Sequence, residues 1–231
     1  MFTTDRFFAK IWSAWTLVVI VTVLMIGLNP TLFAIPAFIV VVAMTLWCIH
    51  CAYRTEYFVS FANLRVFFNV SCAPMFASLL ILGITFKKMK LSAPASLMLG
   101  LAPVVLVLLA YAAAYYWRSK NDILQYKGRR VESIEPPQQV SWWQAGLAAG
   151  LSSVIYPLMK SHDVPATGLI YCLMLISVYM VFYNRDKISA LRDLKAREAK
   201  ENGHYIFMDI EAIQSMRAAS WLGRLFAVRA R

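Results

Sequence analysis

The chain has 231 residues, of which 60% are hydrophobic and only 15% are charged. Soluble globular domains carry about 25% charged residues, so this composition excludes an ordinary soluble domain and indicates a membrane protein. The net charge is +11, from 23 Lys and Arg residues against 12 Asp and Glu residues. In a soluble protein such an excess would favour nucleic acid. Here the charges lie between long apolar stretches, and we expect membrane lipids and no nucleic acid as partners.

Five long stretches contain no Asp, Glu, Lys or Arg, and Asn29-Pro30 interrupts the first of them. A helix needs about 20 apolar residues to cross the hydrocarbon core of a bilayer. The sequence therefore predicts an all-α fold: a polytopic membrane helix bundle in residues 1–184, followed by a basic cytoplasmic tail with one or two helices in residues 185–231. The six expected transmembrane helices are residues 11–28, 31–53, 66–86, 95–117, 141–159 and 165–183.

The distribution of basic residues predicts that both termini are cytoplasmic. In this orientation 19 of the 23 Lys and Arg residues lie inside, a strong positive-inside bias although charges in the tail count for less. Trp and Tyr also gather near the inner ends of the predicted helices. Lys87, Lys88 and Lys90 do not fit this pattern; they lie either in the outer headgroup region or beside a re-entrant third or fourth helix. The expected location is the bacterial inner membrane.

Two glycines one helical turn apart predict a close helix contact in the fifth span. Gly146 and Gly150, with Ser153 one turn further along, leave room for a neighbouring backbone. The contact is either an ordinary one inside the bundle or the face of a homodimer.

One short cluster, Cys48-Ile-His50-Cys51, has residue types that suit zinc or copper. On a helix the two cysteines share a face while the histidine points elsewhere, so the three side chains do not converge. We expect the cysteines to pack in the apolar interior and His50 to form a hydrogen bond, with Asn69 as a candidate partner. The sequence predicts no metal site, no cofactor and no catalytic residue.

The tail is expected to begin with a helix. Residues Asp186–Glu201 have helical character, with Asp193 and Arg197 spaced for an ion pair, and Asn202-Gly203 ends the segment.

The last part of the tail and the loop before the fifth span are basic. Residues 210–226 mix apolar side chains with arginines, which is typical of a helix on an anionic membrane surface or against another protein. Alternatively, the loop and tail charges only set the topology, and the tail is partly disordered. The expected contacts with lipid or a protein partner are Arg118, Lys120, Lys127, Arg129, Arg130, Arg217, Trp221, Arg224, Leu225 and Phe226.

Three functions from different classes remain. The favoured one is a non-enzymatic membrane protein that acts through protein–protein interaction, as an accessory subunit of an envelope assembly or an inhibitor of the immunity or exclusion type. The second is a permease or channel for a small or amphipathic solute. It would be uncoupled, because no carboxylate lies within a predicted span. It would be lined by Thr16, Thr22, Thr45, Asn69, Ser71, Ser78, Ser152 and Ser153. The third is an enzyme acting on a lipid at the inner surface, which would need His50, Arg54 and Glu56 to act together.

Overall fold

A computed structural model describes residues 6–117, 123–134, 165–221 and 223. Within these residues, four helical segments are long and apolar enough to cross a membrane, and they indicate an integral membrane protein. A fifth helix, α6, has a shorter apolar part at Ile170–Tyr183. The membrane-type helices and the two π-helical turns that extend them are α1 Phe7–Leu28, α2 Pro30–Ile49, η1 His50–Arg54, α3 Phe58–Gly83, η2 Ile84–Lys88, α4 Ala93–Tyr116 and α6 Pro165–Tyr183.

Helix α1 begins four residues before the predicted start at residue 11, and α3 begins eight residues before the predicted start at residue 66. The predicted loop of residues 54–65 is therefore mostly helix. Arg65 is accommodated there because its guanidinium donates to the main-chain oxygen of Lys10 at 2.9 Å, on the side of α3 that faces α1. The predicted fifth helix at 141–159, with Gly146, Gly150 and Ser153, lies outside the described residues.

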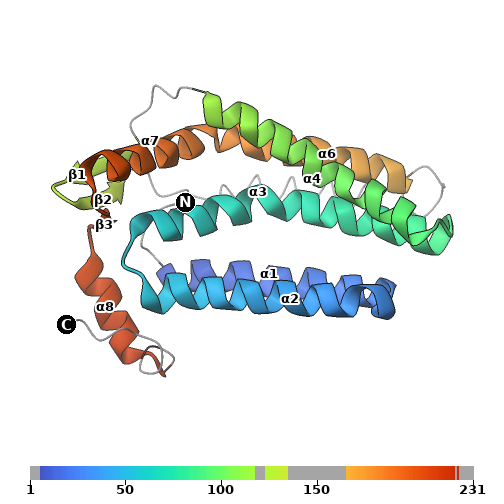
Figure 1. Ribbon diagram of the computed structural model, residues 1–231, viewed down its shortest axis with the longest axis horizontal. Helices are drawn as coiled ribbons and strands as arrows, with labels where there is room; N and C mark the ends of the chain where they lie inside the picture. The colour runs from blue at the N-terminus through green and yellow to red at the C-terminus, as the bar shows by residue number, and fades with distance from the viewer. Residues whose placement is uncertain (1–5, 118–122, 135–164, 222, 224–231) are drawn as a thin grey trace, which may run out of the picture.

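Helix α3 lies in the middle of the bundle (Figure 1), packed against α1, α4 and α6. Helix α2 packs on α1, to which the tight turn at Asn29 joins it. The Asn29 side chain accepts a hydrogen bond from the Leu32 N–H, and Pro30 occupies the first helical position, where its missing N–H costs nothing. Further along the pair, the Trp15 indole N–H donates to the Thr45 hydroxyl at 2.8 Å. Because α2 is held to α1, one face of α3 is left between α2 and α4.

A three-stranded sheet lies at one end of the bundle, and the prediction of an all-α fold is wrong in this respect. Strands β1 (Leu124–Lys127) and β2 (Arg130–Ser133) pair antiparallel, and β3 (Ile206–Phe207) pairs parallel with β2. Gly128 has a φ of 61° at the first position of the hairpin turn, a conformation that glycine adopts without steric cost. The two residues of β3 come from the tail, so no local periodicity marked this strand.

An aromatic cluster joins the sheet to the bundle. The ring of Phe7, from α1, lies 5.0 Å from that of Phe61, from α3, and both rings lie 5.6 Å from that of Phe207, from β3. All three side chains are buried. The bundle and the tail therefore share one core.

The tail helices are α7 (Arg185–Glu201) and α8 (Ile210–Ala219). The first agrees with the predicted helix and ends, as expected, at Asn202, which has a φ of 46°. Asp193 pairs with Arg192 at 2.9 Å, while Arg197 lies over the Tyr126 ring of β1 at 4.5 Å, so the expected Asp193–Arg197 pair gives way to contacts with other partners. Helix α8 is shorter than the predicted segment of 210–226. It stands against the sheet end of the bundle (Figure 1).

Candidate functional site

An elongated cavity of about 740 Å³ lies between the end of α2, one face of α3 and the second half of α4. On α3 the lining residues recur every three or four positions from Ser60 to Met75, so they occupy one face of the helix. At 1.5 Å per residue this face is about 22 Å long. The lining residues are Trp47, His50, Ser60, Asn63, Val66, Phe67, Val70, Ser71, Pro74, Met75, Val104, Val107, Leu108 and Tyr111.

The cavity is polar at the end near the sheet and apolar at the other end. His50 comes from η1, Ser60 and Asn63 come from the first turns of α3, and Tyr111 comes from the last turns of α4. The opposite end is formed mainly by Val70, Pro74, Met75, Val104 and Leu108.

The polar groups of the cavity have free hydrogen-bonding capacity. Within the described part of the chain, no hydrogen bond involves the side chains of His50, Ser60, Asn63 or Tyr111. Ser60, Asn63 and Tyr111 are half-buried, whereas His50 is exposed. A polar group inside a membrane costs free energy unless it is paired. Further along, Pro74 has no N–H to donate to the carbonyl of Val70, which leaves that carbonyl without its usual i+4 donor. The cavity therefore offers donors and acceptors to a bound molecule.

The cavity is open on the side that faces away from the bundle core. Leu108 is 61% exposed and Phe67 is 41% exposed, although both line it. The side chains of this outer rim are apolar. When the helices span a bilayer, the opening therefore faces the hydrocarbon. None of the described lining residues is Asp, Glu, Lys or Arg.

The Cys48–Cys51 cluster is split between two environments. The Cys48 thiol lies 3.9 Å from the Ile11 main-chain oxygen, and the Cys51 thiol donates to the Ser60 main-chain oxygen at 3.5 Å. His50 lies on the cavity side. Among the described residues no group of His, Cys, Asp and Glu is arranged to hold a metal ion.

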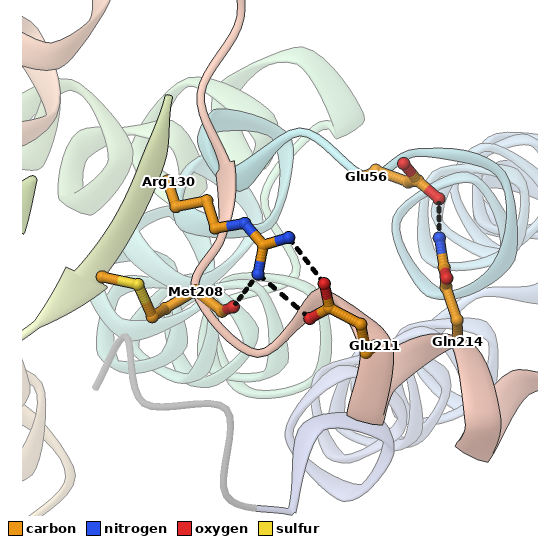
Figure 2. Close-up of polar contacts among 5 residues, drawn as sticks. All are labelled: Glu56, Arg130, Met208, Glu211 and Gln214. Carbon is orange, nitrogen blue, oxygen red and sulfur yellow. Dashed lines mark hydrogen bonds and ion pairs between the residues drawn. The ribbon is translucent and has the colours of Figure 1, made fainter. Parts of the chain in front are cut away.

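A second cluster ties α8 to the end of α2. The guanidinium of Arg217 donates from Nε to the Ala52 main-chain oxygen and from an Nη atom to the Thr55 main-chain oxygen, each at 2.7 Å. Arg217 is buried, and it faces the Phe7 ring at 6.0 Å. Burial lowers the pKa of Arg217, while the negative charge of the nearby Glu56 opposes that shift. We call these contacts, together with those of Figure 2, the tail latch.

Figure 2 shows the exposed part of the tail latch. Arg130, on β2, binds both carboxylate oxygens of Glu211 at 2.5 and 3.1 Å and also donates to the Met208 main-chain oxygen. Gln214 donates to the Glu56 carboxylate at 2.6 Å. Helix α8 is thus fastened to the sheet on one side and to the α2–α3 connection on the other.

The residues predicted from the sequence to contact lipid or a protein partner differ in their exposure. Lys127 and Arg129 are exposed at the β1–β2 hairpin, and Trp221 is 72% exposed after α8. Arg130 is paired with Glu211, and Arg217 is buried rather than on an exposed basic face, because two main-chain carbonyls bind its guanidinium. Arg118, Lys120, Arg224, Leu225 and Phe226 lie outside the described residues.

The described residues of the predicted permease lining and of the predicted enzyme site are brought together only in part. Ser71 does line the cavity. Glu56 binds Gln214, while His50 lies in the cavity, so the described contacts do not join the two residues. Three other predicted lining residues, Thr16, Thr22 and Thr45, donate their hydroxyl hydrogens to carbonyls of their own helices.

Sequence reasoning missed Ser60, Asn63 and Tyr111, which the structure brings to one end of the cavity. Ser60 and Asn63 were assigned to a loop because Arg65 follows them. A helical reading of residues 58–75 would have placed Ser60, Asn63 and Ser71 on one face with Val66, Val70 and Pro74.

Comparison with known proteins gave no match, whether to a protein family, to a curated protein or to a solved structure.

Proposed function

We propose that this integral membrane protein binds an amphipathic molecule taken from the bilayer, in the cavity between α2, α3 and α4. One observation carries the proposal: side chains that have no hydrogen-bond partner in the described part of the chain lie at one end of a mainly apolar cavity that is open toward the membrane. Its volume falls in the range of about 300–1,000 Å³ that is usual for small-molecule sites.

The lining defines the class of ligand. An imidazole, an amide and hydroxyl groups favour a head that both donates and accepts hydrogen bonds. An ionised head would need an opposite charge in a membrane site, and the residues that the structure describes around the cavity include no Lys, Arg, Asp or Glu. The length and the apolar end fit a single hydrocarbon or isoprenoid chain. The ligand is therefore an uncharged alcohol, carbonyl or similar head on one apolar chain.

This proposal is a narrower form of an uncoupled permease or carrier for an amphipathic solute. We place the protein in a bacterial inner membrane with the sheet end on the cytoplasmic side. The reason is that α7 and the β1–β2 hairpin, both at this end, carry most of the Lys and Arg residues that the structure describes. The polar end of the cavity then lies near the inner headgroups, and the ligand's chain points toward the middle of the bilayer.

The test is to purify the protein from native membranes in a mild detergent and to identify co-purifying small molecules by mass spectrometry. Val104→Trp would fill the apolar end of the cavity, and we expect about a tenfold loss of the bound molecule. Val105→Trp is the matched control, because Val105 is 53% exposed and does not line the cavity. Equal recovery of one stoichiometric ligand from both variants, or no ligand in the unmodified protein, would contradict the proposal.

A second candidate function, binding of another protein through the tail, is favoured by the exposure of Trp221. An indole with 72% of its surface accessible is costly in water and is typical of a protein contact. A protein that co-purifies in stoichiometric amount with the unmodified chain but not with Trp221→Ala would support this function. The same co-purifying proteins in both samples would count against it.

A further inference from the structure

The tail latch and the cavity share one short segment of chain. The π-helical turn η1 begins at His50, which lines the cavity, and contains Ala52, which accepts a hydrogen bond from Arg217. The turn closes on His50, since the Thr55 N–H donates to the His50 carbonyl at 3.0 Å. Helix α8 and the polar end of the cavity are therefore connected through six residues.

The chain leaves the helix at Thr55, which is extended with a φ of −112°. The carbonyls near a helix end lack N–H partners from a following turn. Arg217 supplies two donors, to Ala52 and Thr55, from a buried position that water reaches poorly.

A π-helical turn holds one residue more than an α-helical turn, and it persists where surrounding contacts favour it. Return of η1 to α-helical geometry would rotate the residues that follow by about 100° around the helix axis. That rotation would change the direction of the His50 ring relative to Asn63 and Tyr111. The hydrogen bonds from Arg217 oppose it because they hold two carbonyls at their present positions.

We infer that Arg217 is a positioning residue for the ligand cavity, and that docking of α8 determines how tightly the cavity binds its amphipathic ligand. The inference rests on the proposed function of the cavity. It assigns the tail a regulatory role: a partner or surface that pulls α8 from the bundle releases η1, reorients His50 and lowers the affinity for the ligand.

The groups around Arg217 fit a holding role. Glu56, Cys51 and Tyr53 influence its charge electrostatically, and the Phe7 ring covers one face. The Ser220 hydroxyl donates to the Tyr53 hydroxyl at 3.4 Å, which adds a contact between the end of α8 and η1. Three side chains of the tail, spaced three residues apart at positions 214, 217 and 220, thus contact η1 or the residues between η1 and α3.

The test uses the full chain in nanodiscs of phosphatidylethanolamine and phosphatidylglycerol, with hexadecanol carrying a photoreactive diazirine as the probe. After irradiation, peptide mass spectrometry measures labelling of the cavity face of α3 and α4 relative to Leu101 and Leu109, which face outward. We expect the relative labelling of the cavity in Arg217→Met to be about tenfold lower than in the unmodified protein. Arg217→Lys should recover part of it, because a lysine amine reaches one of the two carbonyls. Arg129→Met, the same change at an exposed site of the same end, should leave labelling as in the unmodified protein.

The outcomes separate this inference from the proposed function. Absence of cavity labelling in the unmodified protein would overturn the proposed function. Cavity labelling that is the same in Arg217→Met as in the unmodified protein would overturn the positioning role while leaving the proposed function in place.

If Arg217→Met does not accumulate as a folded protein, Glu211→Ala replaces it, since that change removes the Arg130 pair and loosens α8 outside the bundle. Faster hydrogen exchange in α8 together with reduced cavity labelling would support the inference. Faster exchange with unchanged labelling would overturn it.

Discussion

The guanidinium Nε of Arg217 donates a 2.7 Å hydrogen bond to the main-chain oxygen of Ala52, a residue 165 positions earlier in the chain. Because Ala52 lies in the turn that ends α2, this bond makes the tail part of the membrane bundle's end. Replacing Arg217 therefore affects both the tail and the bundle.

Arg217→Met is expected to weaken the docking of α8 by about 2–4 kcal/mol. The change leaves two buried carbonyls without donors, and hydrogen bonds to charged groups contribute about 1.5–3 kcal/mol each. Hydrogen exchange of the α8 amides should accelerate by about two orders of magnitude, while α3 keeps its protection. Unchanged exchange in α8 would show that other contacts suffice to hold the tail.

Docking of α8 is expected to weaken in acid. The hydrogen bonds from Arg130 hold the pKa of Glu211 below its ordinary value. Since the folded-state pKa is depressed, the stabilisation is present above the ordinary pKa of about 4.3 and is lost as the pH falls through the folded-state value. A spin label at Ser215→Cys, on the exposed face of α8 in a background that lacks Cys172, should gain mobility in this range.

The control for acid sensitivity is a pair of amide variants. Glu211→Gln should remove the transition, because the pair no longer titrates. Glu132→Gln changes an exposed carboxylate on β2, the strand that carries Arg130, and should keep the transition. A transition that persists in Glu211→Gln would mean that another group controls it.

Asn63→Leu is expected to reduce the affinity for the amphipathic ligand by about tenfold. The amide is one of the unpartnered groups at the polar end of the cavity, and loss of one ligand hydrogen bond costs about 1 kcal/mol or more. Binding of a fluorescent long-chain alcohol to the purified protein measures it. Asn69→Leu, on the same helix but outside the cavity lining, should bind as the unmodified protein does.

Gly100→Ala is expected to destabilise the contact between α3 and α4. A Cβ atom at position 100 would lie 2.8 Å from two atoms of the buried Leu82 side chain, so Leu82 must move, at a cost of roughly 1–3 kcal/mol. Thermal unfolding in detergent should occur at a lower temperature. In a Leu82→Ala background, where the clash is absent, Gly100→Ala should lower that temperature less than it does in the unmodified protein.

Gly27→Ala is the matched control, because a Cβ atom there meets nothing within 4 Å. It should leave the unfolding temperature unchanged or raise it slightly, since alanine favours a helix over glycine. A similar loss in both variants would argue against a close contact at Gly100.

Local signals in the sequence were enough to predict the apolar helices α1, α2, α4 and α6, the turn at Asn29-Pro30, and the tail helix that ends at Asn202. These features depend on local properties: apolar stretches long enough for a bilayer, a proline at a first helical position, and a residue that adopts a positive φ. Such signals act within a few residues of the chain, so they can be read without knowledge of the fold.

The sheet, the tail latch and the polar end of the cavity depend instead on contacts between segments that are far apart in the chain. Strand β3 has two residues and exists because β2 offers it hydrogen bonds. The burial of Arg217 depends on carbonyls that α2 leaves unpaired, so its charge alone predicted an exposed contact. The helical spacing of Ser60 and Asn63 places them on one face of α3, but nothing local in the sequence indicates that Tyr111 of α4 lines the same cavity. That depends on α2 being held to α1, which leaves this face of α3 open.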